Sequence, residues 1–292
     1  SMLAAGPRIA KTVCVVIKDG KETEETLLGT GITLRYVPGN VYLDAFDATP
    51  VDDDVNAIAD AYLSGAHSVV KATRDDVIAG ARGYRACCRI LEEQHADAIS
   101  MDCLGILGKL KQSLPCLAWS HMNDDGIPAA CEADVNAIQG HIMVQYLFGR
   151  PGFQQDPVPE TWSGGLIGSH CSCPTRLRGF HAAPEPYDIM PHHGLRDATA
   201  RTLWPEGERA TCLHINKGTK EAPPEFLISA GTVRSNPSVP PSGGCVVAVE
   251  IKFDGAQDPL NFPGFHQIFF LGDYAKPLRD FCQLRGFTAT LV

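Results

Sequence analysis

The sequence predicts an α/β protein in which a parallel α/β (Rossmann-like) layer is followed by a mainly antiparallel β domain. Two observations support this prediction. Short β-branched runs alternate with helical segments up to about residue 158, which is typical of a parallel sheet with covering helices. After about residue 160, short β-branched runs follow one another between Gly and Pro breaks. The chain has 292 residues, enough for two domains, and we predict domains at 1–158 and 159–292.

The first half predicts alternating strands and helices. Residues 11–20 and 31–37 are short β-branched runs and predict strands. Thr73 with Asp76 three residues later forms a capping signal, and the apolar residues behind it recur at helical spacing, which predicts a helix to about residue 95. A strand over 96–103, a helix over 108–124 broken or entered at Pro115, and a strand over 126–131 follow.

A helix over 133–149 comes next, with Asp134 as its N-cap and Gly149 at its end. The second half then predicts strands and one late helix near 275–285. The strand segments are "GGLIGSHC" (164–171), "RATCLHIN" (209–216), "EFLISAGTV" (225–233), "CVVAVEIKF" (245–253) and "HQIFFLGDY" (266–274).

Composition excludes two classes of partner. Apolar residues make up 44% and charged residues 20%, and the net charge of −9 comes from interspersed acids and bases without a basic stripe for nucleic acid. No run approaches the roughly 18 apolar residues of a membrane span. Most of the eleven cysteines lie inside apolar segments, where a free thiol packs as a small hydrophobe, so we expect a reducing, cytoplasmic compartment.

Glu132 is the most informative single residue. It ends the apolar run 127–131 beside a helix N-terminus, at the carboxyl end of a predicted parallel strand, where ligands bind in such sheets. The helix dipole there favours an ionised carboxylate. The simpler interpretation is a first-turn acid of the helix. The segment after the helix can return Asp156 to the same junction, and two acids in a cleft form a metal site or an acid/base pair.

Several segments resemble one known family. They are "ADAISMDCLG", "NDDGIPAACEADVNA", "LFGRPGFQQDP", "SHCSCPT" and "NFPGFHQIFFLGDY". Over residues 70–292 the chain resembles the second and C-terminal domains of the L-fucose and L-arabinose isomerases. Asp156 follows Glu132 by 24 positions, the spacing of the metal-binding Glu and Asp in L-fucose isomerase. The resemblance implies that Glu132, Asp156 and His266 bind a metal, and that His170 and His192 contact the substrate.

The same resemblance implies an enzyme that interconverts an aldose and a ketose through an enediol, with Glu132 and Asp156 as ligands and as proton-transfer groups. Mixed carboxylate and imidazole ligands favour Mn²⁺, with Mg²⁺ and Zn²⁺ as alternatives. The substrate is a small sugar. In the fucose isomerases an N-terminal domain from a neighbouring subunit completes the site, so we expect a homo-oligomer, although this chain has little room for that domain.

Three alternatives stay open on the sequence. A non-catalytic carbohydrate-binding or regulatory protein would keep the fold and the metal but not the reaction. A metal-dependent hydrolase would use the same ligands to activate water. The segment "SHCSCP" also suggests a zinc knuckle of His170, Cys171 and Cys173. Its cysteines are one residue apart and no second pair follows, so we expect them to pack instead.

Overall fold

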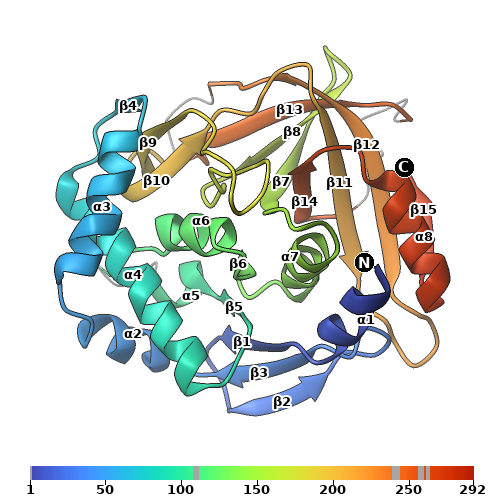
Figure 1. Ribbon diagram of the computed structural model, residues 1–292, viewed down its shortest axis with the longest axis horizontal. Helices are drawn as coiled ribbons and strands as arrows, with labels where there is room; N and C mark the ends of the chain where they lie inside the picture. The colour runs from blue at the N-terminus through green and yellow to red at the C-terminus, as the bar shows by residue number, and fades with distance from the viewer. Residues whose placement is uncertain (1, 108–111, 239–243, 256–259, 261–263) are drawn as a thin grey trace.

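The computed structural model describes residues 2–107, 112–238, 244–255, 260 and 264–292. Over these residues the chain forms a mixed α/β fold with a five-stranded sheet, a three-stranded sheet and a seven-stranded sheet that closes into a barrel. The predicted α/β class, with both parallel and antiparallel sheets, is therefore confirmed. Figure 1 shows the five-stranded sheet at the bottom and the barrel at the upper right.

The five-stranded sheet has the order β2-β3-β1-β5-β6. Its strands β3, β1, β5 and β6 are parallel, and β2 is an antiparallel edge. Each of the strands predicted near residues 15, 35, 100 and 130 is present. The bounds are β1 Val13–Ile17, β2 Thr23–Thr26, β3 Thr33–Val37, β5 Ala98–Met101 and β6 Ala129–Cys131.

Helices cover both faces of this sheet, as the nearly continuous apolar strands require. On β1, Cys14 and Val16 face a cluster that includes α1 and α7, and Val15 and Ile17 face α2, α4 and α6. Further helices α3 and α5 complete this half, and α3 packs beside α4 (Figure 1). The bounds are α1 Met2–Ala10, α2 Asn40–Asp47, α3 Asp53–Gly65, α4 Arg74–Glu93, α5 Cys103–Leu107, α6 Cys116–Asp124 and α7 Val135–Phe148.

The predicted helix ends follow their local signals. Thr73 and Asp76 form a reciprocal capping box at the start of α4. The helix predicted over 108–124 is entered at Pro115, which is the N-cap of α6, and its first positions 108–111 lie outside the described residues. Asp134 caps α7, and Gly149 ends it in the left-handed conformation.

Six strands form the closed antiparallel barrel in the order β11-β14-β7-β8-β13-β12, and β11 pairs with β12 to close it. A seventh strand, β15, is parallel to β12, and α8 precedes it at the predicted position. The bounds are β7 Phe153–Glu160, β8 Gly165–His170, β11 Arg209–Asn216, β12 Glu225–Ser235, β13 Val247–Phe253, β14 Gln267–Leu271, α8 Ala275–Arg285 and β15 Thr288–Leu291.

Two pairings connect the segments on either side of residue 158. Strand β7 begins at Phe153 and belongs to the barrel. In the three-stranded sheet β10-β9-β4, the short β4 (Ser68–Val69) pairs with β9 (Tyr187–His192), and β10 is Arg196–Thr202. One buried cluster accordingly includes residues from both segments, among them Trp119, Phe153 and Trp204.

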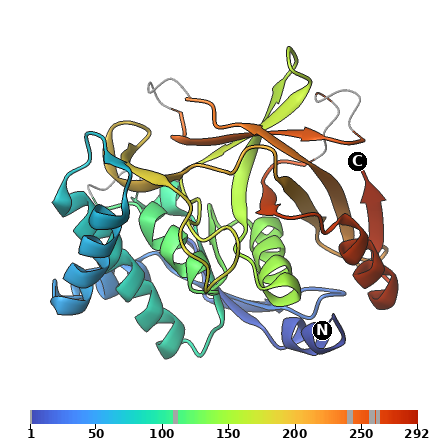
Figure 2. The ribbon, with the colours of Figure 1, turned by 45° about the horizontal axis from the view of Figure 1, so that its top comes forward.

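Helix α7 lies between the five-stranded sheet and the barrel (Figures 1 and 2). Nine consecutive residues from Ala137 to Gln145 are buried, so the helix is covered on all sides. At Gly140, an added Cβ would lie 2.5 Å from Ile268 of β14. Glycine at this position therefore permits the helix and the barrel strand to approach closely.

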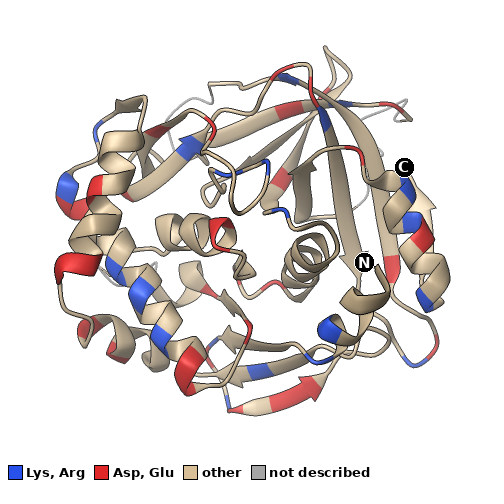
Figure 3. Cartoon of the chain, viewed as in Figure 1, with Lys and Arg blue, Asp and Glu red and all other residues tan. Residues whose placement is uncertain are grey.

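Charges of both signs are intermixed on the outer elements, as Figure 3 shows along α4 and α8. Ion pairs one helical turn apart, such as Arg89 with Glu93 and Lys276 with Asp280, account for part of this pattern. Among the helices that the structure describes, none combines the length and the apolarity required to cross a membrane.

Gly149 offers a test of the end of α7. Its φ is +63°, and an added Cβ would have no atom within 4 Å, so Gly149→Ala introduces backbone strain without a clash. We expect this variant to lose about 1 kcal/mol of unfolding free energy in urea titrations. Asn tolerates the left-handed region, so Gly149→Asn should lose less. Equal stabilities of the two variants would contradict the assigned conformation.

Candidate metal centre

A strained turn carries Glu132. Directly after β6, Glu132 and Ala133 have φ values of 65° and 51°, which non-glycine residues rarely adopt. Each such residue costs about 1–2 kcal/mol relative to its ordinary conformation. Because strain of this kind persists mainly where function requires it, the turn supports a functional role for Glu132.

Gln154 joins this turn to the barrel. The backbone N–H of Cys131 donates to Gln154 Oε1 at 2.8 Å, and Gln154 Nε2 donates to the Cys131 carbonyl at 3.5 Å. Side chains two residues apart on a strand lie on the same face, so Asp156 shares the face of Gln154 on β7. The amide of Gln154 therefore brings the Asp156 carboxylate to the side of Glu132.

The ring of His266 meets both carboxylates. His266 directly precedes β14 and is only 2% exposed. Its Nε2 lies 3.2 Å from Asp156 Oδ1 and 3.6 Å from Glu132 Oε2. The three residues implied as metal ligands thus come together at one place, from β6, β7 and the start of β14.

Two of these atoms have no hydrogen-bond partner. Asp156 Oδ1 and His266 Nε2 are buried, and neither makes a hydrogen bond within the described part of the chain. Oxygen and nitrogen ligands about 2.0–2.6 Å from one ion lie about 3–3.6 Å from each other. Asp156 Oδ1 and His266 Nε2 lie 3.2 Å apart, where a protonated ring pairs with the carboxylate, and the same separation fits two ligands of one cation.

His170 adds a fourth potential ligand to this group. Its Nε2 lies 3.7 Å from Glu132 Oε1, and potential ligand atoms of Glu132, His170 and His266 all lie within 4.8 Å of one another. The Nδ1 atom of His170 is 3.2 Å from Ser172 Oγ, which orients the ring. His170, expected to contact substrate, is therefore also close enough to bind the metal.

Asp134 has two contacts. Its Oδ1 accepts hydrogen bonds from the backbone N–H groups of Asn136 and Ala137, as a helix cap does. Its Oδ2 accepts from Nδ1 of His266 at 2.8 Å. A carboxylate on the outer nitrogen of a histidine ligand fixes the ring and leaves the other nitrogen for the metal. Sequence reasoning identified only the cap, because the position of His266 depends on tertiary packing.

The charges in the centre shift the pKa values of its members. The contact with His170 lowers the pKa of Glu132, against the effect of burial. Burial would raise the pKa of Asp156, but contact with His266 and the nearby His170 charge lower it. Burial would lower the pKa of His266, but Asp134, Asp156 and Glu132 raise it to about 9. Without metal, the imidazolium therefore neutralises part of the carboxylate charge.

His192 lies in a second group of side chains. Its Nδ1 is 3.4 Å from Cys116 Sγ, and its ring stacks on His193 with centroids 3.9 Å apart. His193 in turn lies close to Cys171 and Cys245, and contacts with Cys116 and Cys245 hold the pKa of the Cys171 thiol well below its usual value. Within the described residues, Glu132, Asp156, His170 and His266 lie together, and His192 lies beside these thiols.

Comparisons with known proteins give no family for this chain. Neither a scan against protein-family models nor a search of curated proteins found a match.

The raised pKa of His266 predicts how the stability of the metal-free protein depends on pH. A folded pKa of about 9 lies above the ordinary value of 6.5, so the protonated ring stabilises the fold fully below pH 6.5. This contribution is lost as the pH rises through about 9. In chelator, we expect the unfolding free energy of wild type to fall over this interval more than that of His266→Gln. The exposed-site variant His181→Gln should follow wild type, and equal profiles for all three proteins would contradict the assignment.

The turn at Glu132 predicts an unusual order of stabilities. Glu132→Ala and Glu132→Gly both remove the carboxylate, but only glycine relieves the left-handed backbone. Without metal, the glycine variant should therefore be more stable than the alanine variant by about 1 kcal/mol in urea unfolding. An alanine variant as stable as the glycine variant would exclude strain at this position.

Proposed function

We propose that this protein is a metal-dependent sugar isomerase that interconverts an aldose and a ketose, or a close homologue of such an enzyme. The observation that carries the proposal is the convergence of Glu132, Asp156 and His266, where His266 Nε2 lies 3.2 Å from Asp156 Oδ1 and 3.6 Å from Glu132 Oε2. In this proposal, the parallel layer and the barrel correspond to the second and C-terminal domains of the L-fucose and L-arabinose isomerases.

The reaction requires a proton to move between C1 and C2 of an open-chain sugar. A bound divalent ion would polarise the substrate's carbonyl and hydroxyl oxygens. Glu132 and Asp156 have lowered pKa values and stay ionised at neutral pH, so each carboxylate can hold the ion or accept the proton. His170 lies beside Glu132 and can bind a substrate hydroxyl group.

The ligand set favours Mn²⁺ as the ion. Carboxylate oxygens with imidazole nitrogens suit an ion that accepts more than four ligands, whereas zinc prefers a closed tetrahedral set. Asp134 orients His266 from the outer nitrogen, which leaves Nε2 facing the two carboxylates. Mg²⁺ and Zn²⁺ are the alternatives. Assembly into a homo-oligomer and a cytoplasmic location remain predictions.

The proposal is tested first by metal binding. Because the ion binds only the folded chain, Mn²⁺ at one hundred times its Kd should stabilise the fold by about 2.7 kcal/mol. We expect a thermal shift of wild type in differential scanning fluorimetry, and Glu132→Gln should lose most of it. Glu206→Gln changes an exposed carboxylate and should keep the whole shift. If Glu132→Gln and Glu206→Gln showed equal thermal shifts with Mn²⁺, the ion would bind at a site that does not include Glu132.

Activity is tested with a panel of aldoses in Mn²⁺, with the ketose product measured. We expect conversion that Glu132→Gln abolishes, and only weak conversion of fucose or arabinose by a monomer, because no neighbouring subunit then covers the site and excludes water. Saturable manganese binding without conversion of any aldose would favour the non-catalytic alternative. If the protein neither bound Mn²⁺ nor converted any aldose, the proposal that it is an enzyme of this class would be refuted.

A further inference from the structure

A second group of potential metal ligands lies outside the carboxylate centre. The sulfur atoms of Cys171 and Cys245 and a ring nitrogen of His193 all lie within 4.8 Å of one another. These residues come from three segments that are distant in sequence. Cys171 directly follows β8, His193 directly follows β9, and Cys245 precedes β13. Only the tertiary structure brings them together.

The distances fit tetrahedral zinc. With Zn–S of about 2.3 Å and Zn–N of about 2.0–2.1 Å, sulfur and nitrogen ligands of one zinc ion lie about 3.6 Å apart. Cys245 Sγ and His193 Nε2 are 3.5 Å apart. The chemistry fits as well, because thiolates select zinc over the oxygen-binding Mn²⁺ and Mg²⁺. The two groups would thus bind different metals.

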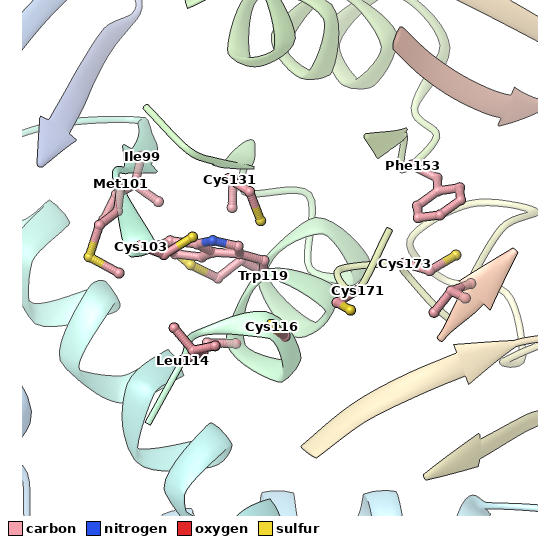
Figure 4. Close-up of a cluster of buried hydrophobic side chains, with 14 of the residues drawn as sticks. Ile99, Met101, Cys103, Leu114, Cys116, Trp119, Cys131, Phe153, Cys171 and Cys173 are labelled. Carbon is pink, nitrogen blue, oxygen red and sulfur yellow. The ribbon is translucent and has the colours of Figure 1, made fainter. Parts of the chain in front are cut away.

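The surroundings support a built site rather than a chance contact. Cys171 is buried, and the thiol of Cys116, the first residue of α6, contacts it (Figure 4). His193 has a φ of 50°, a left-handed conformation that is costly for histidine. His192 contacts both of these residues. Its ring stacks on the ring of His193, and its Nδ1 lies 3.4 Å from the Cys116 sulfur.

We propose that Cys171, Cys245 and His193 bind a zinc ion at a site separate from the carboxylate centre. The ion links the end of β8, the turn after β9 and the segment before β13, and so joins the barrel to the three-stranded sheet. This site differs from the knuckle considered in the sequence. His170 belongs to the carboxylate centre, and the Cys173 thiol contacts the Pro174 carbonyl.

Cobalt provides a probe that distinguishes the two centres. Thiolate ligands to Co²⁺ produce a charge-transfer absorption in the near ultraviolet, which carboxylate and imidazole ligands do not. We expect reduced wild-type protein, titrated with Co²⁺ after metal removal, to develop this absorption to one equivalent, and one equivalent of Zn²⁺ to abolish it. Native mass spectrometry should then show one tightly bound zinc ion.

Variants assign the ligands. Cys171→Ser and Cys245→Ser should each lose the absorption, and His193→Gln should weaken Co²⁺ binding at least tenfold. Cys88→Ser removes a thiol of α4 outside the group and is the matched control that should retain full binding. Glu132→Gln should also retain it, so that failure of the isomerase proposal would leave this result unchanged.

Three results would overturn the proposal. The first is a wild-type titration without thiolate absorption, a result that does not depend on whether any variant folds. The second is a loss of absorption in Cys88→Ser as large as in Cys171→Ser. The third is a native mass spectrum of the reduced protein that shows no bound zinc ion after one equivalent of Zn²⁺ is added.

Discussion

The burial of helix α7 between two sheets is the constraint on which the candidate metal centre depends. The helix is covered on all sides, so its position is determined by packing against both β5–β6 and the barrel. Its first turn follows Glu132 and includes the cap Asp134, and its last turn leads into β7 with Asp156. Gly140 permits the close approach of Ile268 in β14, two residues beyond His266. The position of this one buried helix therefore sets the spacing of Glu132, Asp134, Asp156 and His266.

Charge balance explains why these groups tolerate burial together. Three carboxylates surround one imidazole, and each isolated charge would be costly away from water. In the metal-free protein a proton on His266 supplies one positive charge, and the raised pKa reflects this. A divalent ion in place of that proton would supply two. In the proposed metal-bound form, the ion would therefore neutralise more of the carboxylate charge than the proton does.

The two ligand groups differ in chemistry although they share a segment. His170 and Cys171 are adjacent in sequence, yet the imidazole meets Glu132 and the thiol meets Cys245 and His193. The oxygen-rich group suits a metal with open positions for substrate, and the thiol group suits zinc. This division separates a proposed catalytic centre from a second proposed metal site of different chemistry.

Local sequence signals predicted many of the elements and several of their ends, but α2, α3, β4, β9 and β10 were not among the predicted segments. The capping signal at Thr73, the left-handed Gly149 and the β-branched run of β1 act over a few residues, so local chemistry decides them. The return of the chain after the helix also indicated that Asp156 can meet Glu132. The closure of the barrel and the entry of β7 into it follow only from the tertiary structure. The same holds for the hydrogen bond from His266 to Asp134 and for the meeting of Cys171, His193 and Cys245. These contacts join residues far apart in the chain, and their geometry depends on how the sheets and α7 pack, which no local pattern of residues encodes.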